Sequence, residues 1–272
     1  MSTERSGDVY THGHHPSVLA SHTWRTAENS AAYLLDRLRP GQDLLDVGCG
    51  PGTITAGLAA RLAPGRVVGL DRDAGVLEKA RGAVERDGLG RHVELVTGDV
   101  YDLPFRDARF DVVHAHQVLQ HLTDPVAALG EMRRVLRPGG LLAVRDSDYA
   151  AMTWYPDIPG LGEWNELYHR LTRANGAEAD AGRRLHVWVR QAGFTELEVS
   201  AGTWCFQTTE ERTWWSSLWA DRVTASAFAR QALEAGFATE EDLARLAAAW
   251  RAWGEDPEGW FTVLHGQVLA RR

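Results

Sequence analysis

The chain has 272 residues, of which 44% are hydrophobic and 24% are charged, and its formal net charge is −8. This composition is typical of a globular protein with a sizeable core, and it disfavours a membrane-spanning segment and a basic surface for nucleic acid. The two cysteines do not suggest a disulfide framework and the polar N-terminus does not resemble a signal peptide, so we expect a cytoplasmic protein.

The N-terminal segment, residues 1–40, is expected to form a helical cap. Its pattern is helical over residues 16–38, and Thr26 is a candidate N-cap. Four of the eleven histidines fall between His12 and His22, which is an unusual concentration. These histidines could form a catalytic cluster, or they could belong to a polar tail without a role.

Residues 41–148 alternate short apolar runs with helical patterns. The runs are rich in valine and leucine without polar alternation, which is typical of parallel strands covered on both faces. They occupy residues 44–47, 67–70, 93–96, 111–114 and 141–144. Helices are expected between them, with Asp73 and Asp124 as caps. Repeated strand–helix units predict a doubly wound α/β sheet.

The alternation stops after residue 148. We expect a helical cover over residues 149–182. The sheet is expected to be completed by residues 183–203 and 260–272, with strands over 195–201 and 260–269. Residues 204–259 would form a helical insert between those strands, and seven of the eleven tryptophans lie between Trp204 and Trp260.

A glycine-rich loop, Gly48-Cys49-Gly50-Pro51-Gly52, follows the first predicted strand. In open α/β sheets, ligands bind at the carboxyl ends of the strands, where glycine lets a ligand approach the backbone. The spacing is G-x-G-x-G, and Thr53 occupies the position of the last glycine in the dinucleotide fingerprint. Asp71 ends the next strand and could accept ribose hydroxyls, although a nicotinamide cofactor would use such an acid too.

Five segments together resemble class I S-adenosylmethionine-dependent methyltransferases, especially the ubiquinone/menaquinone branch. The resemblance covers residues 40–146, and the matching segments are 44–52, 68–71, 98–105, 110–113 and 136–140. It implies a Rossmann-like, seven-stranded sheet whose last strand is antiparallel. It also implies S-adenosylmethionine as the methyl donor and S-adenosylhomocysteine as the product.

The resemblance also implies a cofactor site. The loop would pack against the methionine part and the ribose, Asp71 would bind the ribose hydroxyls, and Asp99 would bind the adenine. An N-terminal helix would close over the cofactor and bring Arg25 to its carboxylate. Asp46 could fix the loop or contact the methionine ammonium, and we leave both interpretations open. The full predicted set is Tyr10, His22, Arg25, Asp46, Gly48, Cys49, Gly50, Gly52, Asp71, Arg72, Asp99, Val100, His116 and Gln117.

Methyl transfer from an activated donor depends mainly on positioning, and some acceptors also need a base. Histidine can serve as the base near neutral pH. The candidates for catalysis are His14, His15, His121 and Asp148. His114 lies inside a predicted strand and is expected to be a packed core residue. The histidines and cysteines show no paired spacing typical of a metal site, so no metal is expected.

The tryptophans allow two interpretations. Trp250 and Trp253 fit an ordinary amphipathic helix, whereas the denser set of Trp204, Trp214, Trp215 and Trp219 would suit the cover of an acceptor pocket or a homodimer interface. We therefore expect methyl transfer to a small hydrophobic or aromatic acceptor, with oxygen, nitrogen and carbon all open. The alternatives are a non-catalytic S-adenosylmethionine-binding protein and a nicotinamide-dependent oxidoreductase.

Overall fold

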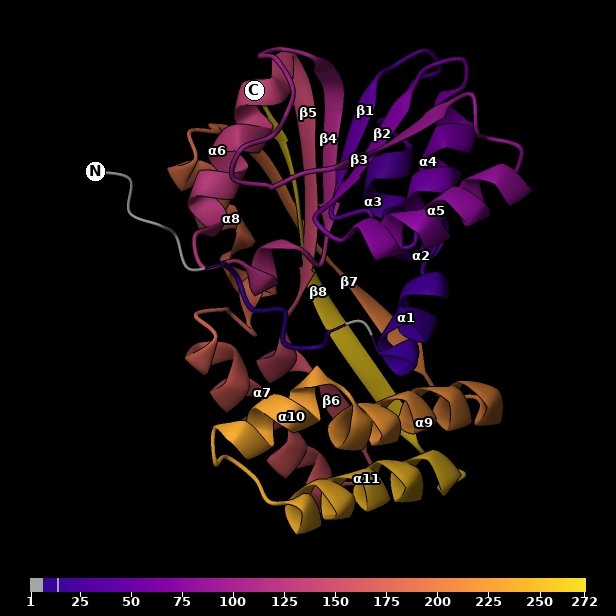
Figure 1. Ribbon diagram of the computed structural model, residues 1–272, viewed down its shortest axis with the longest axis vertical. Coiled ribbons are helices and arrows are strands. Elements are labelled where there is room, and N and C mark those ends of the chain that lie inside the picture. The colour runs from indigo at the N-terminus through magenta and orange to yellow at the C-terminus, as the bar shows by residue number, and fades with distance from the viewer. Residues whose placement is uncertain (1–6, 14) are drawn as a thin grey trace.

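A mixed β-sheet organises the fold, and helices cover both of its faces (Figure 1). The computed structural model describes residues 7–13 and 15–272. Within that part of the chain the sheet has eight strands: β1 Leu44–Val47, β2 Val67–Asp71, β3 Val93–Thr97, β4 Phe110–His116, β5 Leu136–Ser147, β6 Thr153–Tyr155, β7 Glu196–Phe206 and β8 Trp260–Arg271.

The first five strands pair in parallel in the order β3-β2-β1-β4-β5. Leu44 of β1 is level with Val67 on one side and with Val112 on the other. Every residue of β1 is buried, because helices cover both faces of the sheet at this point. The doubly wound α/β fold predicted from the apolar runs is confirmed.

The last strand, β8, runs antiparallel to β5 and β7, which confirms the antiparallel strand predicted at the end of the chain. The short β6 also pairs with β8, so the sheet has eight strands instead of the expected seven. Strand β7 continues to Phe206, beyond residue 201 where the sequence pattern ends. Trp204 therefore lies on the sheet and not in the helical insert to which the sequence pattern assigns it.

Helices α2, α3 and α4 pack on one face of the sheet, and α6 and α8 pack on the other (Figure 1). Asp73 and Asp124 cap α5 and α6 as predicted, since their side chains accept from the amides of Val76 and Ala127. The covering helices are α2 Ala27–Ser30, α3 Ala32–Leu35, α4 Thr53–Leu62, α5 Ala74–Arg86, α6 Pro125–Val135 and α8 Ala181–Gln191.

A further layer of helices lies at the end of the sheet where β8 begins (Figure 1). Thr208 and Thr239 start two of its helices with capping boxes that include Glu211 and Asp242. The layer contains α7 Pro159–Ala174, α9 Thr209–Ala225, α10 Ala227–Glu234 and α11 Glu240–Glu255, with α1 Pro16–Thr23 beside α9 and the short turns η1 Leu119–His121 and η2 Tyr149–Ala151 nearby. No helix in residues 7–13 and 15–272 is long and apolar enough to span a membrane.

Tryptophan rings form the core of this layer. Trp219 of α9 stacks on Trp250 of α11 with 5.6 Å between ring centroids, and Trp164 of α7 meets Trp250 edge-on at 4.8 Å. Trp253 packs beside Trp250, so the amphipathic packing expected of α11 is present. Because aromatic side chains bury large apolar areas, these rings hold α7, α9 and α11 together without a second sheet.

We predict that Trp164→Ala lowers the free energy of unfolding by about 3–5 kcal/mol, because it leaves a large cavity between three helices. Trp164 is 0% exposed, whereas Trp260 is 38% exposed and provides a matched control as Trp260→Ala. Urea unfolding followed by circular dichroism measures both. Equal losses for the two variants would contradict the central role of Trp164.

Candidate cofactor and acceptor site

A cavity of about 400 Å³ lies at the carboxyl ends of β1, β2 and β4, between the sheet and the helical layer. This is the edge of a doubly wound sheet at which ligands bind. The cavity brings together most of the predicted cofactor-binding residues, and its lining includes Tyr10, His22, Arg25, Asp46, Gly48, Cys49, Gly50, Asp71, Arg72, Asp99, Val100, His116 and Gln117.

The glycine loop borders the cavity with backbone atoms. Gly48 has a φ of +66°, and a β-carbon there would lie 2.4 Å from Val118 Cγ2. Only glycine satisfies both the left-handed backbone and the close approach. Gly52 does not line the cavity; it has a φ of +80° at the start of α4, and a β-carbon would lie 2.9 Å from the β-carbon of Ala80. Gly52 thus lets α4 pack closely against α5, and its predicted contact with the cofactor stays a prediction.

Asp46 lies beneath the loop and is 2% exposed. One carboxylate oxygen is 2.7 Å from His114 Nδ1 of β4, and the other accepts from Thr55 Oγ1 of α4 at 2.6 Å. Both oxygens therefore have protein partners, which favours the interpretation that Asp46 fixes the loop. His114 is fully buried, in agreement with its predicted place in the core. Burial also raises the pKa of the Cys49 thiol, so this cysteine is not an activated nucleophile.

The acids predicted to bind the ribose and the adenine lie at the ends of neighbouring strands. Asp71 ends β2, and its carboxylate accepts from the Gly50 amide at 3.0 Å, which ties it to the glycine loop. Asp99 follows β3 and accepts from the Tyr101 amide at 2.9 Å. The other oxygen of Asp71 accepts from the Asp73 amide at 3.0 Å, so each of its oxygens has a backbone donor. A carboxylate oxygen can accept two hydrogen bonds, which is compatible with the predicted ligand contacts.

The N-terminal segment crosses the mouth of the cavity. Arg72 donates to the backbone oxygen of Asp8 at 2.9 Å, and the Asp8 carboxylate accepts from the Thr123 amide at 2.9 Å. Gly7, Asp8, Tyr10 and His12 all line the cavity. The expected closure by the N-terminal region thus involves this extended segment as well as α1.

Gln117 follows β4 with a φ of +54°, which is unusual for a residue with a side chain. Its amide oxygen accepts from Arg25 Nη2 at 2.7 Å, and its amide nitrogen donates to His265 Nε2 at 2.8 Å. Arg25 Nε is buried and has no partner among the described residues. Strained backbone of this kind concentrates at functional sites, and here it holds the Gln117 side chain between Arg25 and β8.

Aromatic and imidazole side chains enclose the other end of the cavity. His12 Nε2 lies 3.1 Å from the Tyr168 hydroxyl and 3.4 Å from the Tyr149 hydroxyl. The Tyr10 hydroxyl lies 3.4 Å from His22 Nε2, and its ring meets the His121 ring edge-on at 4.8 Å. These groups come from the N-terminal segment, α1, η1, η2 and α7, which are far apart in the sequence.

These imidazoles are neutral at physiological pH. Burial, with help from nearby arginines, lowers the pKa of His12 and His22 well below the ordinary value. Burial also lowers the pKa of His121 to about 3 and raises the pKa of Tyr10 to about 12. The Nδ1 atoms of His12 and His121 are buried and have no partner in the described part of the chain. A neutral ring with an unused nitrogen can form a hydrogen bond with a bound ligand.

The residues predicted to be catalytic have different positions. His121 lines the cavity, whereas the His15 side chain caps α1 by accepting from the Ser17 amide at 3.3 Å. His14 lies outside the described residues. Asp148 does not line the cavity; its carboxylate is buried in an ion pair with Arg183, with 2.6 Å from Oδ2 to Nε, which favours a structural role.

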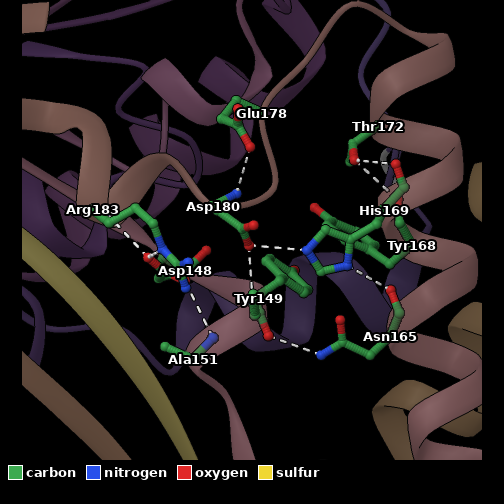
Figure 2. A network of polar contacts seen from close by, with 12 residues as sticks. Asp148, Tyr149, Ala151, Asn165, Tyr168, His169, Thr172, Glu178, Asp180 and Arg183 are labelled. Carbon is green, nitrogen blue, oxygen red and sulfur yellow. Dashed lines mark hydrogen bonds and ion pairs between the residues drawn. The ribbon is translucent and has the colours of Figure 1, made fainter.

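Figure 2 shows how this ion pair belongs to a structural network. Asp148 also accepts from the Ala151 amide at 3.2 Å, while the nearby Asp180 accepts from His169 of α7 at 2.9 Å. The network connects η2 with α7 and α8. It therefore supports Tyr149, which lines the cavity, and Tyr168, which contacts His12.

His12 is the residue that the predicted catalytic set omits. Its signal in the sequence was the histidine cluster itself, but nothing local distinguished it from His14 or His15. The ring of His12 meets the Trp219 ring edge-on at 5.8 Å, and Trp24, Trp204 and Trp215 line other parts of the same cavity. Trp214 instead packs on Trp24 at 5.4 Å between centroids, outside the lining. Three of the four tryptophans expected to cover an acceptor pocket thus border the cavity.

Comparison with known proteins identifies the class. Residues 45–144 match the methyltransferase domain family. An uncharacterized methyltransferase of Schizosaccharomyces pombe is 36% identical over 282 aligned residues, covering 100% of this chain and 99% of that protein. The chain therefore belongs to the class I S-adenosylmethionine-dependent methyltransferases, and S-adenosylmethionine is its methyl donor.

Two further proteins show how far the likeness extends. The demethylmenaquinone methyltransferase of Listeria monocytogenes is 36% identical over 140 residues, which is 51% of this chain and 55% of that protein. The structure of geranyl diphosphate methyltransferase in complex with S-adenosylmethionine has a TM-score of 0.56 at 18% identity, and the match covers 96% of this chain and 94% of that chain. The first likeness covers about half of each chain, and the second shows a shared fold.

Asp146, at the end of β5, yields a prediction on stability. Burial raises the pKa of Asp146 to about 8 in the folded protein, whereas the pKa of an aspartate in an unfolded chain is about 3.9. Folding thus favours the protonated form of Asp146. The free energy of unfolding therefore falls as the pH rises from about 4 to about 8, because the unfolded chain releases this proton and the folded protein keeps it. Oδ1 accepts from the Gln120 amide at 3.1 Å, a bond that Asp146→Asn keeps.

Relative to Asp146→Asn, the free energy of unfolding of the wild type should fall by up to about 1.4 kcal/mol per pH unit in this window. Chemical unfolding at about pH 5, 6.5 and 8 measures the difference in the free energy of unfolding between the wild type and Asp146→Asn. Asp124→Asn, at an exposed helix cap, is the control. A gap that does not change with pH would show that Asp146 is ionised in the folded protein.

Proposed function

We propose that this enzyme methylates a small aromatic or hydrophobic acceptor bound among Tyr10, His12, His121 and the tryptophan walls. The observation that carries the proposal is one cavity that contains Asp71 and Asp99 on its cofactor side and these aromatic groups on the other. Pockets lined by apolar and aromatic groups with a few polar atoms are typical of small-molecule sites.

The cofactor side fits S-adenosylmethionine. Backbone atoms of Gly48 and Gly50 border the cavity without side chains that would fill it, and Asp71 and Asp99 offer acceptors for ribose hydroxyls and the adenine amino group. Arg25 has an unpartnered Nε for the methionine carboxylate. Arg72 and Val100 would flank the adenine, while His116 and Gln117 would border the methionine part. When bound, the cofactor supplies a methyl group already activated on a sulfonium.

The chain's own residues then orient the acceptor and manage its proton. Trp204, Trp215 and Trp219 exclude water and restrict a planar acceptor. His12 Nε2 lies within hydrogen-bond distance of two tyrosine hydroxyls, and its Nδ1 has no partner in the described residues. In the tautomer in which Nε2 donates to a tyrosine oxygen, Nδ1 carries the lone pair and faces the acceptor's proton. The Nε2 of His121 accepts from the Gln120 amide nitrogen at 2.9 Å, so its Nδ1 carries the ring hydrogen and would donate a hydrogen bond to the acceptor.

The acceptor class is tested by incubating the enzyme with labelled S-adenosylmethionine and a panel of small aromatic phenols, acids and amines. We expect methylated product and S-adenosylhomocysteine with at least one member, since the aromatic walls favour planar rings. Polar aliphatic compounds and nucleic acid serve as the comparison set. Methylation confined to that comparison set would contradict the proposal.

Asp71→Ala should weaken cofactor binding by about 1–3 kcal/mol, because the ribose hydroxyls lose their charged acceptor. Calorimetric titration with S-adenosylhomocysteine measures the dissociation constant. Asp73→Ala is the matched control, since Asp73 caps α5 two residues away and does not line the cavity. Similar dissociation constants for wild type and Asp71→Ala would show that this acid only holds the loop.

A further inference from the structure

Arg222 of α9 is a buried cation on the acceptor side of the cavity. It is 4% exposed and lines the cavity. Nη2 donates to the backbone oxygen of Ser17 at 3.2 Å and to the hydroxyl of Ser21, which orients the guanidinium from α1. Nε is buried without a partner in residues 7–13 and 15–272. The side chain is thus held in place at Nη2, while its Nε donor is unused.

The surroundings of Arg222 are aromatic and contain no balancing charge. Its guanidinium carbon lies 4.9 Å from the centroid of the Trp219 ring. Tyr10, Tyr149 and Tyr168 are near enough to interact with its charge, but burial raises the pKa of each, so their hydroxyls stay protonated. Within the described residues, no carboxylate forms an ion pair with Arg222. An arginine keeps its charge under these conditions, and a buried unpaired charge is costly.

The other charges of the cavity do not neutralise Arg222. Arg25 is a second cation, and the charge of Arg222 lowers the pKa of Arg25 further after burial has lowered it. Asp46 is engaged with His114 and Thr55, and Asp71 is bonded to the glycine loop. In the proposed function Arg25 is matched by the cofactor's carboxylate. The positive charge at Arg222 is then left for the acceptor.

We infer that Arg222 binds an ionised oxygen, as in a carboxylate or a phenolate, on the aromatic methyl acceptor, with Trp219 stacked beside the guanidinium. The inference rests on the proposed aromatic acceptor and narrows it to an anionic one. Guanidinium groups bind such oxygens through charge-assisted hydrogen bonds, and these bonds are strongest where water is excluded. Arg222 is in this sense a specificity-determining residue and not part of the methyl transfer itself.

The test compares two probes that differ in charge but hardly in shape, 2-naphthoate and the neutral 2-naphthamide. Each is titrated by calorimetry into the enzyme saturated with S-adenosylhomocysteine. We expect the wild type to bind 2-naphthoate at least about 10-fold more tightly, because only the carboxylate satisfies the buried cation. Arg222→Gln should abolish this preference, and Arg222→Lys should keep part of it.

Arg212→Gln is the matched control. Arg212 lies on the same helix, is similarly buried, and also has an unpartnered Nε, but it does not line the cavity. This variant should keep the wild-type preference. Circular dichroism and binding of S-adenosylhomocysteine establish whether each variant is folded. If Arg222→Gln does not fold, the preference for 2-naphthoate measured in the wild type and in Arg222→Lys still tests the inference.

Equal binding of both probes by the wild type would overturn the inference but leave the aromatic acceptor standing. An undiminished preference in folded Arg222→Gln would overturn it too, since another group would then hold the anion. If neither probe binds while S-adenosylhomocysteine does, both the anionic and the aromatic acceptor are wrong, and only the cofactor site remains.

Discussion

The buried carboxylate of Asp46 is the interaction on which the site depends. It connects three elements at once, because it belongs to β1 and is bonded to His114 of β4 and Thr55 of α4. A buried carboxylate is tolerated only when its oxygens are hydrogen-bonded, so these partners cannot move independently. The glycine loop lies between β1 and α4, and its left-handed backbone is therefore held in one conformation.

The cavity above this loop is closed by segments from both ends of the chain. Residues within 7–12 and 21–25 line it from the N-terminal side, while α9 and β8 supply Trp219, Arg222 and Val263. The Trp-rich layer gives these side chains a rigid support, since its rings are packed between α7, α9 and α11. Burial at this end of the cavity lowers the pKa of the histidines, so they are neutral, and the arginines carry the positive charge of the cavity.

Much of the cofactor half could be predicted from sequence, because its signals are local. Apolar runs without alternation predict buried parallel strands, and the glycine spacing with Asp71 and Asp99 at the next strand ends predicts a nucleotide-like ligand. Parallel strands bring their carboxyl ends to one edge, so these residues converge whatever the rest of the chain does. Gly52 shows the limit, since local sequence does not reveal that its positive φ also lets α4 pack against Ala80 of α5.

The sequence by itself therefore determined the doubly wound sheet, the donor site and a concentration of histidines and tryptophans. Only the tertiary structure decided which of them meet. Asp148 is removed from the site by an ion pair with Arg183, which is 35 residues away, and His12 enters it by bonding to Tyr168, which is 156 residues away. Arg222 looks like any helical arginine until α1 and Trp219 bury it. Such contacts depend on how distant elements pack, and no local pattern records them.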